Sequence, residues 1–271
     1  MKKFFIRTIS GAVLLLLLCS AFFYGGIYLW LLLFGITVTG LTELLKAVGK
    51  NKKNSYINIV LYAGTLIYYL LLFFTMKTEY LMGAIVLTLI MMMCVCVFDY
   101  PKHSFSEIAG SAFAFLYITV MLSFVYITRM GENGLYLIWI TIISSWGCDT
   151  CAYLVGCSIG KRRLAPVLSP KKSVEGAIGG SVGAGLIGAL VGFGLHKFGK
   201  ADIDFIMLFS IISLLASIAS QIGDLMASAI KREYNIKDYG NIIPGHGGVL
   251  DRFDSMIVTA PIIFFLGVLF K

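Results

Sequence analysis

The stretch from Ser217 to Asp254 carries the residues of this chain that are best suited to chemistry. A mainly apolar helix predicted over 203–231 has polar residues spaced by three or four positions, which places them on one helical face. They are Ser217, Ser220, Gln221, Asp224, Ser228 and Lys231. An ionisable side chain at membrane depth is costly and usually functional, so Asp224 is the first candidate for a catalytic role.

A short segment rich in charge and glycine follows this helix. It contains Lys231–Arg232, Lys237–Asp238, Pro244–Gly248 and Asp251–Asp254, and a new apolar run begins at Met256. Acids, bases and a histidine are therefore concentrated between two apolar segments.

A second polar cluster lies over residues 158–174, where serines and glycines alternate with cations. The cations are Lys161, Arg162, Arg163, Lys171 and Lys172. Because they precede a glycine-rich helix predicted over 175–196, the backbone N–H groups and the cations together favour phosphate binding. An alternative is that these cations only set membrane orientation or bind anionic headgroups, which leaves the interleaved serines and glycines unexplained.

Asp149 is a second acid within an apolar run. It lies about eight residues before the inner end of the helix predicted over 134–157, or roughly 12 Å deep at 1.5 Å per residue. Asp224 lies at a similar distance from the inner end of its own helix, so two carboxylates are predicted at one depth. A helix-packing hydrogen bond from a protonated Asp149 is the alternative.

Carboxylates beside basic residues, without a cluster of His or Cys, suit Mg²⁺ and a polyphosphate. The metal neutralises phosphate charge while Lys and Arg bind the remaining oxygens, as in nucleotidyl transfer. The sequence has no glycine-rich loop ending in Gly-Lys-Ser or Gly-Lys-Thr. Cys148 and Cys151 have the spacing of zinc ligands but no second pair, so we interpret them as packing residues.

The elements that position these residues are membrane helices. The chain has 271 residues, of which 59% are hydrophobic and 13% charged, a composition typical of a polytopic membrane protein. The net charge of +8 does not indicate nucleic-acid binding, because the basic residues lie between apolar runs. We therefore expect an all-α integral membrane protein with no nucleic-acid partner.

A span needs roughly 20 apolar residues. Nine segments meet this criterion: about 6–23, 26–47, 56–75, 79–98, 107–128, 134–157, 175–196, 203–231 and 254–270. If the amino terminus is cytoplasmic, most of the 22 lysines and arginines fall on the inner side, including Lys50, Lys52 and Lys53. Lys200 and Lys271 are among those that fall outside. This asymmetry predicts a cytoplasmic amino terminus and an outer carboxyl terminus.

The predicted spans form two regions. Residues 1–130 are expected to be mainly structural, and residues 131–271 to form the catalytic region with cytoplasmic loops 158–174 and 232–253. In the first region Glu43, Lys102 and His103 are interpreted as interfacial, snorkelling groups.

Two ordered motifs resemble the phosphatidate cytidylyltransferase family, also called CDP-diacylglycerol synthases. The first motif runs without a gap from Ser228-Ala-Ile-Lys-Arg232 through Lys237-Asp-Tyr-Gly240 to Ile243-Pro-Gly-His-Gly-Gly-Val-Leu-Asp-Arg-Phe-Asp254. The second contains Asp149, Ala152-Tyr153, Gly156, Gly160-Lys161, Ser169-Pro-Lys-Lys172 and Glu175-Gly176. Departures are Cys157, where many members have a basic residue, and Ser173-Val174, which replace a frequent threonine and tryptophan. These departures affect individual substrate contacts.

The resemblance implies that CTP and phosphatidate react with Mg²⁺ to give CDP-diacylglycerol and pyrophosphate. It implies that Asp224 and Asp251 hold the metal centre and that Asp149 and Lys172 belong to the polar pocket. Whether a second cation binds beside Mg²⁺ stays open. Expected substrate-binding residues are Ser169, Lys171, Ser228, Lys231, Arg232, Lys237, His246 and Arg252. The attacking phosphate oxygen is already anionic, so His246 is predicted to bind or shape the loop and not to act as a base.

The resemblance also implies a homodimer in a membrane, and we expect the bacterial cytoplasmic membrane with the active site facing the cytoplasm. Two other functions stay open. Asp149 and Asp224 would also serve an ion or solute transporter. A related enzyme could use another lipid phosphate or a polyprenol acceptor.

Overall fold

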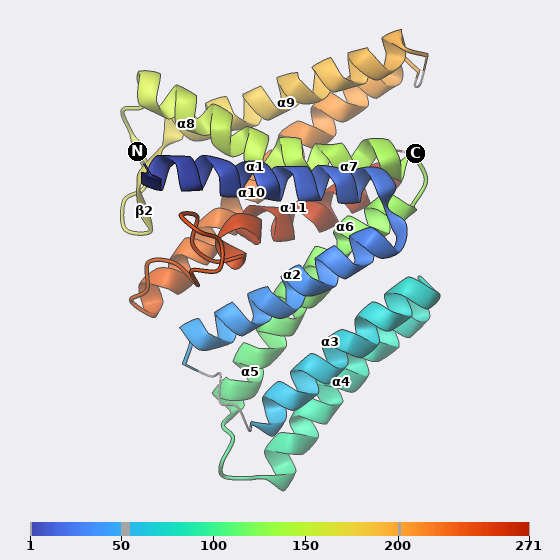
Figure 1. Cartoon of the computed structure of the whole chain (residues 1–271), viewed down its shortest axis with the longest axis vertical. Coiled ribbons are helices and arrows are strands. Elements are labelled where there is room, and N and C mark those ends of the chain that lie inside the picture. Colours follow the sequence, from blue (N-terminus) through green and yellow to red (C-terminus); the bar gives the residue numbers. More distant parts are fainter. Residues whose placement is uncertain (1, 50–54, 200–201, 271) are drawn as a thin grey trace. The chain divides into compact units, whose positions relative to one another are not determined.

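The computed structural model describes residues 2–49, 55–199 and 202–270 (Figure 1). Among these residues, nine helical segments are long and apolar enough to cross a membrane. They are Phe5–Tyr24, Gly26–Ala47, Tyr56–Phe74, Thr78–Phe98, Phe105–Met130, Gly134–Ile159, Val174–Lys197, Asp204–Glu233 and Leu250–Leu269. The predicted polytopic all-α class and its nine spans are confirmed, whereas the orientation of the termini stays a prediction.

Two of these spans contain a π-helical turn. The elements in order are α1 (Lys2–Tyr24), α2 (Gly26–Ala47), α3 (Tyr56–Phe74), α4 (Thr78–Phe98), α5 (Phe105–Ala114), η1 (Phe115–Val120), α6 (Met121–Met130), α7 (Gly134–Ile142), η2 (Ile143–Gly147), α8 (Cys148–Ile159), β1 (Arg163–Ala165), β2 (Ser169–Ser173), α9 (Val174–Lys197), α10 (Asp204–Glu233) and α11 (Leu250–Leu269). Lys50, Lys52, Lys53, Lys200 and Lys271, which contributed to the predicted charge asymmetry, lie outside the described residues.

The chain divides into two compact units. The first unit comprises Met1–Ile127 and Ile236–Arg252, and the second comprises Thr128–Asn235 and Phe253–Lys271. The division falls close to the predicted boundary after residue 130, but the segment 236–252 joins the first unit. The assignment of structural and catalytic roles to residues 1–130 and 131–271 stays a prediction.

In the first unit, helix α2 packs against α3, and α3 packs against α4. Aromatic rings fill the contact between α2 and α3: Trp30 stacks on Phe34, and Tyr69 of α3 lies against both rings. The Tyr69 hydroxyl pairs with Thr37 Oγ1 at 2.6 Å, so the buried phenol has a polar partner.

Two predictions of snorkelling side chains in this unit are wrong. Glu43 has only 3% of its surface exposed and His103 only 8%. Glu43 accepts backbone hydrogen bonds from the segment 249–250, and His103 lies between the Asp99 and Glu107 carboxylates. Both are buried because specific partners replace water. The Lys102 side chain is 75% exposed, as expected of an interfacial group.

Helix α9 lies against α8 and α10 in the second unit because glycines line its contact faces. A Cβ at Gly180 would lie 3.0 Å from the Cys148 carbonyl oxygen of α8, and a Cβ at Gly192 would lie 2.7 Å from the Phe205 carbonyl oxygen of α10. Small residues of this kind allow membrane helices to approach closely. The three backbones are thereby held near one another.

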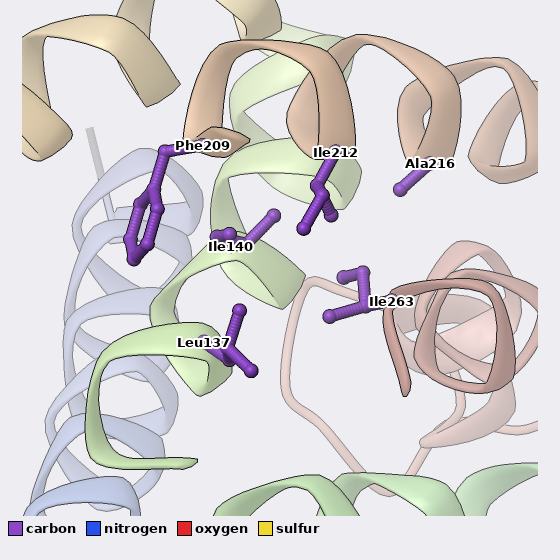
Figure 2. Packing of buried hydrophobic residues seen from close by; sticks show 6 residues of the cluster. All are labelled: Leu137, Ile140, Phe209, Ile212, Ala216 and Ile263. Carbon is purple, nitrogen blue, oxygen red and sulfur yellow. The ribbon is translucent and has the colours of Figure 1, made fainter. Parts of the chain in front are cut away.

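An apolar core fixes α7, α10 and α11 in the same unit (Figure 2). Leu137 and Ile140 of α7 meet Phe209, Ile212 and Ala216 of α10, and Ile263 of α11 completes the cluster. This core lies along the part of α10 that precedes Asp224, so it anchors the helix that carries the predicted catalytic acid.

The predicted loop 158–174 contains a short antiparallel hairpin of β1 and β2, with Arg163 opposite Ser173 and Ala165 opposite Ser169. The hairpin is tied to its surroundings by backbone contacts. Glu175 accepts hydrogen bonds from the N–H groups of Lys161 and Arg162, at 3.0 and 3.1 Å. The basic residues are therefore presented by an ordered ribbon next to the start of α9.

Candidate active site in the second unit

A pocket of about 590 Å³ lies in the second unit. Its walls come from α8, the hairpin, α9 and α10. The lining residues are Asp149, Ala152, Tyr153, Gly156, Cys157, Gly160, Arg163, Leu164, Lys171, Lys172, Ser173, Gly176, Ala177, Gln221 and Asp224. Both carboxylates predicted from depth, Asp149 and Asp224, thus line one pocket together with Lys171 and Lys172.

The two central charges in this pocket are paired. The Lys172 ammonium forms an ion pair with the Asp224 carboxylate, and about a quarter of each side chain is exposed. The pocket therefore holds a carboxylate and a cation that solvent or a ligand can reach. Such a pair can exchange its internal contact for contacts with a phosphate or a cation.

Asp149 follows the π-helical turn η2, which spans Ile143–Gly147. A π-turn rotates the following residues relative to a continuous α-helix and often occurs at functional sites. The interruption lies directly before the helix that carries Asp149, and α8 runs on from this point along the pocket wall.

Gln221 joins three helices at the floor of the pocket. Its Nε2 donates to the Ala177 carbonyl oxygen at 3.1 Å and to Ser181 Oγ at 2.9 Å, both on α9, and it contacts Cys148 Sγ at 3.6 Å. Asp224 lies one turn further along α10. Gln221 belongs to the polar face predicted from the sequence but had no predicted site role, since a polar stripe does not reveal which neighbour each side chain contacts.

Ser173 holds the junction between the hairpin and α9. As N-cap residue of α9 it accepts a hydrogen bond from the Gly176 N–H at 3.1 Å. A Cβ at Gly160 would lie 2.6 Å from Ser173 Oγ, so this position admits only a glycine without rearrangement. Ser173 and the glycines of the segment predicted to bind phosphate therefore shape the pocket at a helix N-terminus.

Asp254 is a third carboxylate near the pocket, outside its lining, to which the motif gave no predicted role. It is 7% exposed, accepts a hydrogen bond from the Ser255 N–H at 2.7 Å, and interacts electrostatically with Asp224, Lys231 and Asp149. A Cβ at Gly223 would lie 2.9 Å from the Asp254 carbonyl oxygen, which shows how closely α11 approaches α10. Its position at the end of the recognised motif was the available signal.

The other predicted residues of the second unit lie outside the pocket lining. They are Ser169, Ser228, Lys231 and Arg232. Arg232 donates from Nε to the Leu168 carbonyl oxygen at 3.3 Å, so it ties the hairpin to the end of α10. This hydrogen bond gives Arg232 a role in holding the hairpin.

Four predicted site residues belong to the first unit: Lys237, His246, Asp251 and Arg252. Asp251 is 8% exposed, and its Oδ2 accepts the N–H groups of Tyr239 at 2.8 Å and Gly248 at 3.0 Å. Arg252 donates from Nε to the His246 carbonyl oxygen at 3.0 Å. These contacts fold the segment 239–252 upon itself.

His246 is packed against α1. Its Nδ1 lies 2.9 Å from Ser10 Oγ, and Ser10 also donates towards the Pro244 carbonyl oxygen at 2.9 Å. Burial lowers the pKa of His246, and the nearby Arg252 and Arg7 lower it further. The imidazole is therefore neutral at pH 7, in a position that shapes the loop.

The comparison with known sequences agrees with these motifs. The chain matches the model of the cytidylyltransferase family over residues 5–270, nearly its full length. The chain belongs to the cytidylyltransferase family. The resemblance inferred from the two motifs is thereby confirmed.

Relatives within the cytidylyltransferase family carry the name phosphatidate cytidylyltransferase. The protein from Bacillus subtilis (strain 168) is 40% identical over 169 residues, which are 62% of this chain and 61% of the relative. That from Rickettsia bellii (strain RML369-C) is 46% identical over 142 residues, 51% of this chain and 60% of the relative. That from Rickettsia prowazekii (strain Madrid E) is 35% identical over 223 residues, 82% of this chain and 95% of the relative. The chain thus spans about three fifths of the first two relatives and nearly all of the third.

Carboxylate oxygens are the donors that this cytidylyltransferase-family pocket offers to a metal ion. Within the described residues, no group of three or more His, Cys, Asp and Glu side chains is arranged to hold a metal. Mg²⁺ is commonly bound through one or two carboxylates while substrate phosphates and water complete its shell, so Asp224 with Asp149 fits this chemistry. The predicted metal partners Asp224 and Asp251 belong to different units, and their joint ligation stays a prediction.

Proposed function

We propose that this chain transfers the cytidylyl group of CTP to phosphatidate, forming CDP-diacylglycerol and pyrophosphate. The observation that carries the proposal is the pocket that joins Asp149, Asp224, Lys171 and Lys172, in a membrane protein of the cytidylyltransferase family. The name of the relatives supports the choice of substrates.

In this reaction an oxygen of the phosphatidate phosphate forms a bond to the α-phosphorus of CTP. The bond between that phosphorus and the oxygen bridging to the β-phosphate breaks, and pyrophosphate leaves with the bonding electrons. The attacking oxygen is anionic at neutral pH, so no general base is required. Catalysis must come from positioning and from neutralising charge.

The residues of the pocket have separate roles in this proposal. Lys171 and Lys172 bind phosphate oxygens, and Arg163 extends the cationic wall. Asp149 and Asp224 would hold Mg²⁺, with Asp251 as the further metal partner that the resemblance implies, and the ion would neutralise charge on the phosphates. Because a carboxylate has two oxygens, Asp224 can pair with Lys172 and still offer a ligand.

A lipid acceptor must reach the pocket without leaving the bilayer. The pocket includes exposed Tyr153, 70% accessible, and exposed Cys157. A pocket open at such apolar and amphipathic side chains admits a phosphate headgroup while acyl chains stay in lipid. We propose this opening as the lipid entrance, in a bacterial cytoplasmic membrane with the pocket facing the cytoplasm.

The direct test uses the purified full-length protein in detergent with radiolabelled CTP, phosphatidate and Mg²⁺, scored for lipid-linked cytidine. Asp224→Asn and Asp251→Asn are each expected to lower turnover by about 100-fold or more, the typical effect of removing a main electrostatic group. Asp204→Asn is the matched control, since Asp204 is exposed in the first turn of the same helix, α10.

The acceptor is tested separately by replacing phosphatidate with a polyprenyl phosphate. Transfer to phosphatidate with no transfer to the polyprenyl phosphate supports the proposal. Preferential transfer to the polyprenyl phosphate would assign the chain to another lipid phosphate. If the protein shows a cooperative thermal unfolding transition, and so is folded, yet gives no lipid-linked product with either acceptor, cytidylyl transfer is refuted.

A further inference from the structure

Glu43 of α2 makes contacts in the first unit that the reaction scheme does not use. Its carboxylate is almost fully buried, with 3% of the residue exposed. Oε1 accepts the Val249 N–H at 3.0 Å, and Oε2 accepts the Leu250 N–H at 2.8 Å. These are backbone donors at the start of α11, where N–H groups lack helical partners. A negative charge is favourable at this helix end.

Two glycines of the loop that Glu43 contacts leave space for its carboxylate. A Cβ at Gly248 would lie 2.6 Å from Glu43 Oε2, and all three nearest atoms to that position belong to Glu43. A Cβ at Gly240 would also collide with the Glu43 carboxylate. Neither glycine has a positive φ, so backbone conformation does not require glycine there. Glycine is required at both positions because the Glu43 carboxylate fills the space that a Cβ would need.

Two carboxylates, Glu43 on α2 and Asp251 at the start of α11, hold the backbone of the same loop. Glu43 takes the N–H groups of Val249 and Leu250, while Asp251 takes those of Tyr239 and Gly248. Three consecutive residues, 248–250, are therefore held through their backbone. Asp251 and Arg252 come directly after these residues in the chain, so the orientation of their side chains depends on this fixed backbone.

We propose that Glu43 is a positioning residue for the transfer reaction, which clamps the loop and thereby orients Asp251 and Arg252. The proposal rests on the proposed function, because only the reaction gives that orientation a kinetic consequence. Glu43 itself touches no reacting atom. Its effect passes through the backbone of residues 248–250.

The first experiment measures the clamp with no substrate present. Hydrogen–deuterium exchange of the full-length protein is compared between wild type, Glu43→Gln and Thr37→Val. Glu43→Gln replaces one acceptor oxygen with a donor that faces a backbone N–H, so faster exchange is expected at residues 248–250 and 239. Thr37 lies on α2, as Glu43 does, and Thr37→Val removes a buried hydrogen bond to Tyr69 of α3, so this variant is expected to leave the loop unchanged.

The second experiment measures the kinetic consequence. Glu43→Gln is expected to lower kcat by about 10- to 100-fold, the range for a residue that supports catalytic ligands, and to raise the Mg²⁺ concentration for half activity. Thr37→Val is expected to retain wild-type kcat even where its thermal stability falls. Glu43→Gln with wild-type kcat and wild-type Mg²⁺ dependence would overturn the proposal.

A double-mutant cycle makes the test specific to this contact. Gly248→Ala is expected to lower kcat by at least tenfold in the wild-type background, because its methyl group meets the Glu43 carboxylate. In a Glu43→Ala background the same change should cost less than threefold, since the space is then vacant. Equal costs in both backgrounds would overturn the proposal. An inactive wild type would refute cytidylyl transfer, while the exchange experiment would still decide whether Glu43 holds the loop.

Discussion

At the scale of single residues, the pocket is defined by charges that neutralise each other until a ligand arrives. Lys172 pairs with Asp224, and the Asp254 carboxyl group interacts electrostatically with Asp224 and Asp149 in the second unit. A membrane protein tolerates these groups because each has a charged or hydrogen-bonding partner. Replacing one member of the pair therefore changes both ligand binding and the electrostatics of the remaining acid.

Lys172→Met should lower kcat/KM for CTP by about 10- to 100-fold, corresponding to the loss of a charge-assisted hydrogen bond of about 1.5–3 kcal/mol. Steady-state kinetics with radiolabelled CTP measures this. Lys161→Met is the control, because Lys161 is exposed on the same segment and does not line the pocket. Equal effects of the two substitutions would mean that only the overall positive charge of the segment matters.

His246→Gln should leave turnover within about tenfold of wild type and leave the pH profile of kcat without a lost basic limb, because no general base is required. Rate measurements between pH 5.5 and pH 9 test this, with pH values chosen around the ordinary histidine pKa of about 6.5. Loss of the basic limb on substitution would show that His246 takes a proton in the reaction.

The lowered pKa of His246 also predicts a pH effect on stability. Below about pH 6.5 the unfolded chain binds a proton that folded His246 resists, so acidification favours unfolding. The stabilisation is complete above the unfolded pKa and is lost as the pH falls. Melting temperatures in detergent should therefore fall less on acidification in His246→Gln than in wild type.

At the scale of elements, the glycine-lined faces of α9 determine the width of the pocket. The side facing α8 carries Gly176, Gly180 and Gly183, and the side facing α10 carries Gly185, Gly188 and Gly192. Larger residues would separate the helices that carry Asp149 and Asp224. The two acids would then no longer share one pocket.

Gly192→Ala should destabilise the protein by about 1–3 kcal/mol, since its methyl group would meet the backbone of α10 and force the helices apart. Gly194→Ala, two residues away with open space at its Cβ, should be neutral or slightly stabilising. Thermal unfolding in detergent compares the two variants. Similar melting temperatures would contradict the close packing of α9 and α10.

At the scale of the whole molecule, the charge distribution predicts that the pocket opens towards the cytoplasm. Cys157 is an exposed thiol in the pocket wall and can report on this side. A variant that keeps Cys157 and replaces the other five cysteines with serine or alanine should react with a membrane-impermeant maleimide in inside-out vesicles. Intact right-side-out vesicles should show little reaction.

CTP with Mg²⁺ should slow this labelling, because a bound nucleotide fills the pocket. A cysteine introduced at Lys197, at the other end of α9, serves as the opposite-side control. Labelling of Cys157 from the outer side alone would reverse the predicted orientation.

The amino-acid sequence alone was sufficient for the spans, the two polar segments and the family, since these depend on local composition and on ordered motifs. It also placed Asp149 and Asp224 at one depth, because helical rise converts residue number into distance. It could not show that Lys172 pairs with Asp224, that Gln221 joins α9, or that Glu43 is buried against residues 249–250. Those contacts join residues far apart in the chain, and only helix packing decides which of them meet. Glu43 is the clearest case: a lone acid near a helix end is consistent with snorkelling, and burial becomes favourable only when the folded loop supplies two backbone donors.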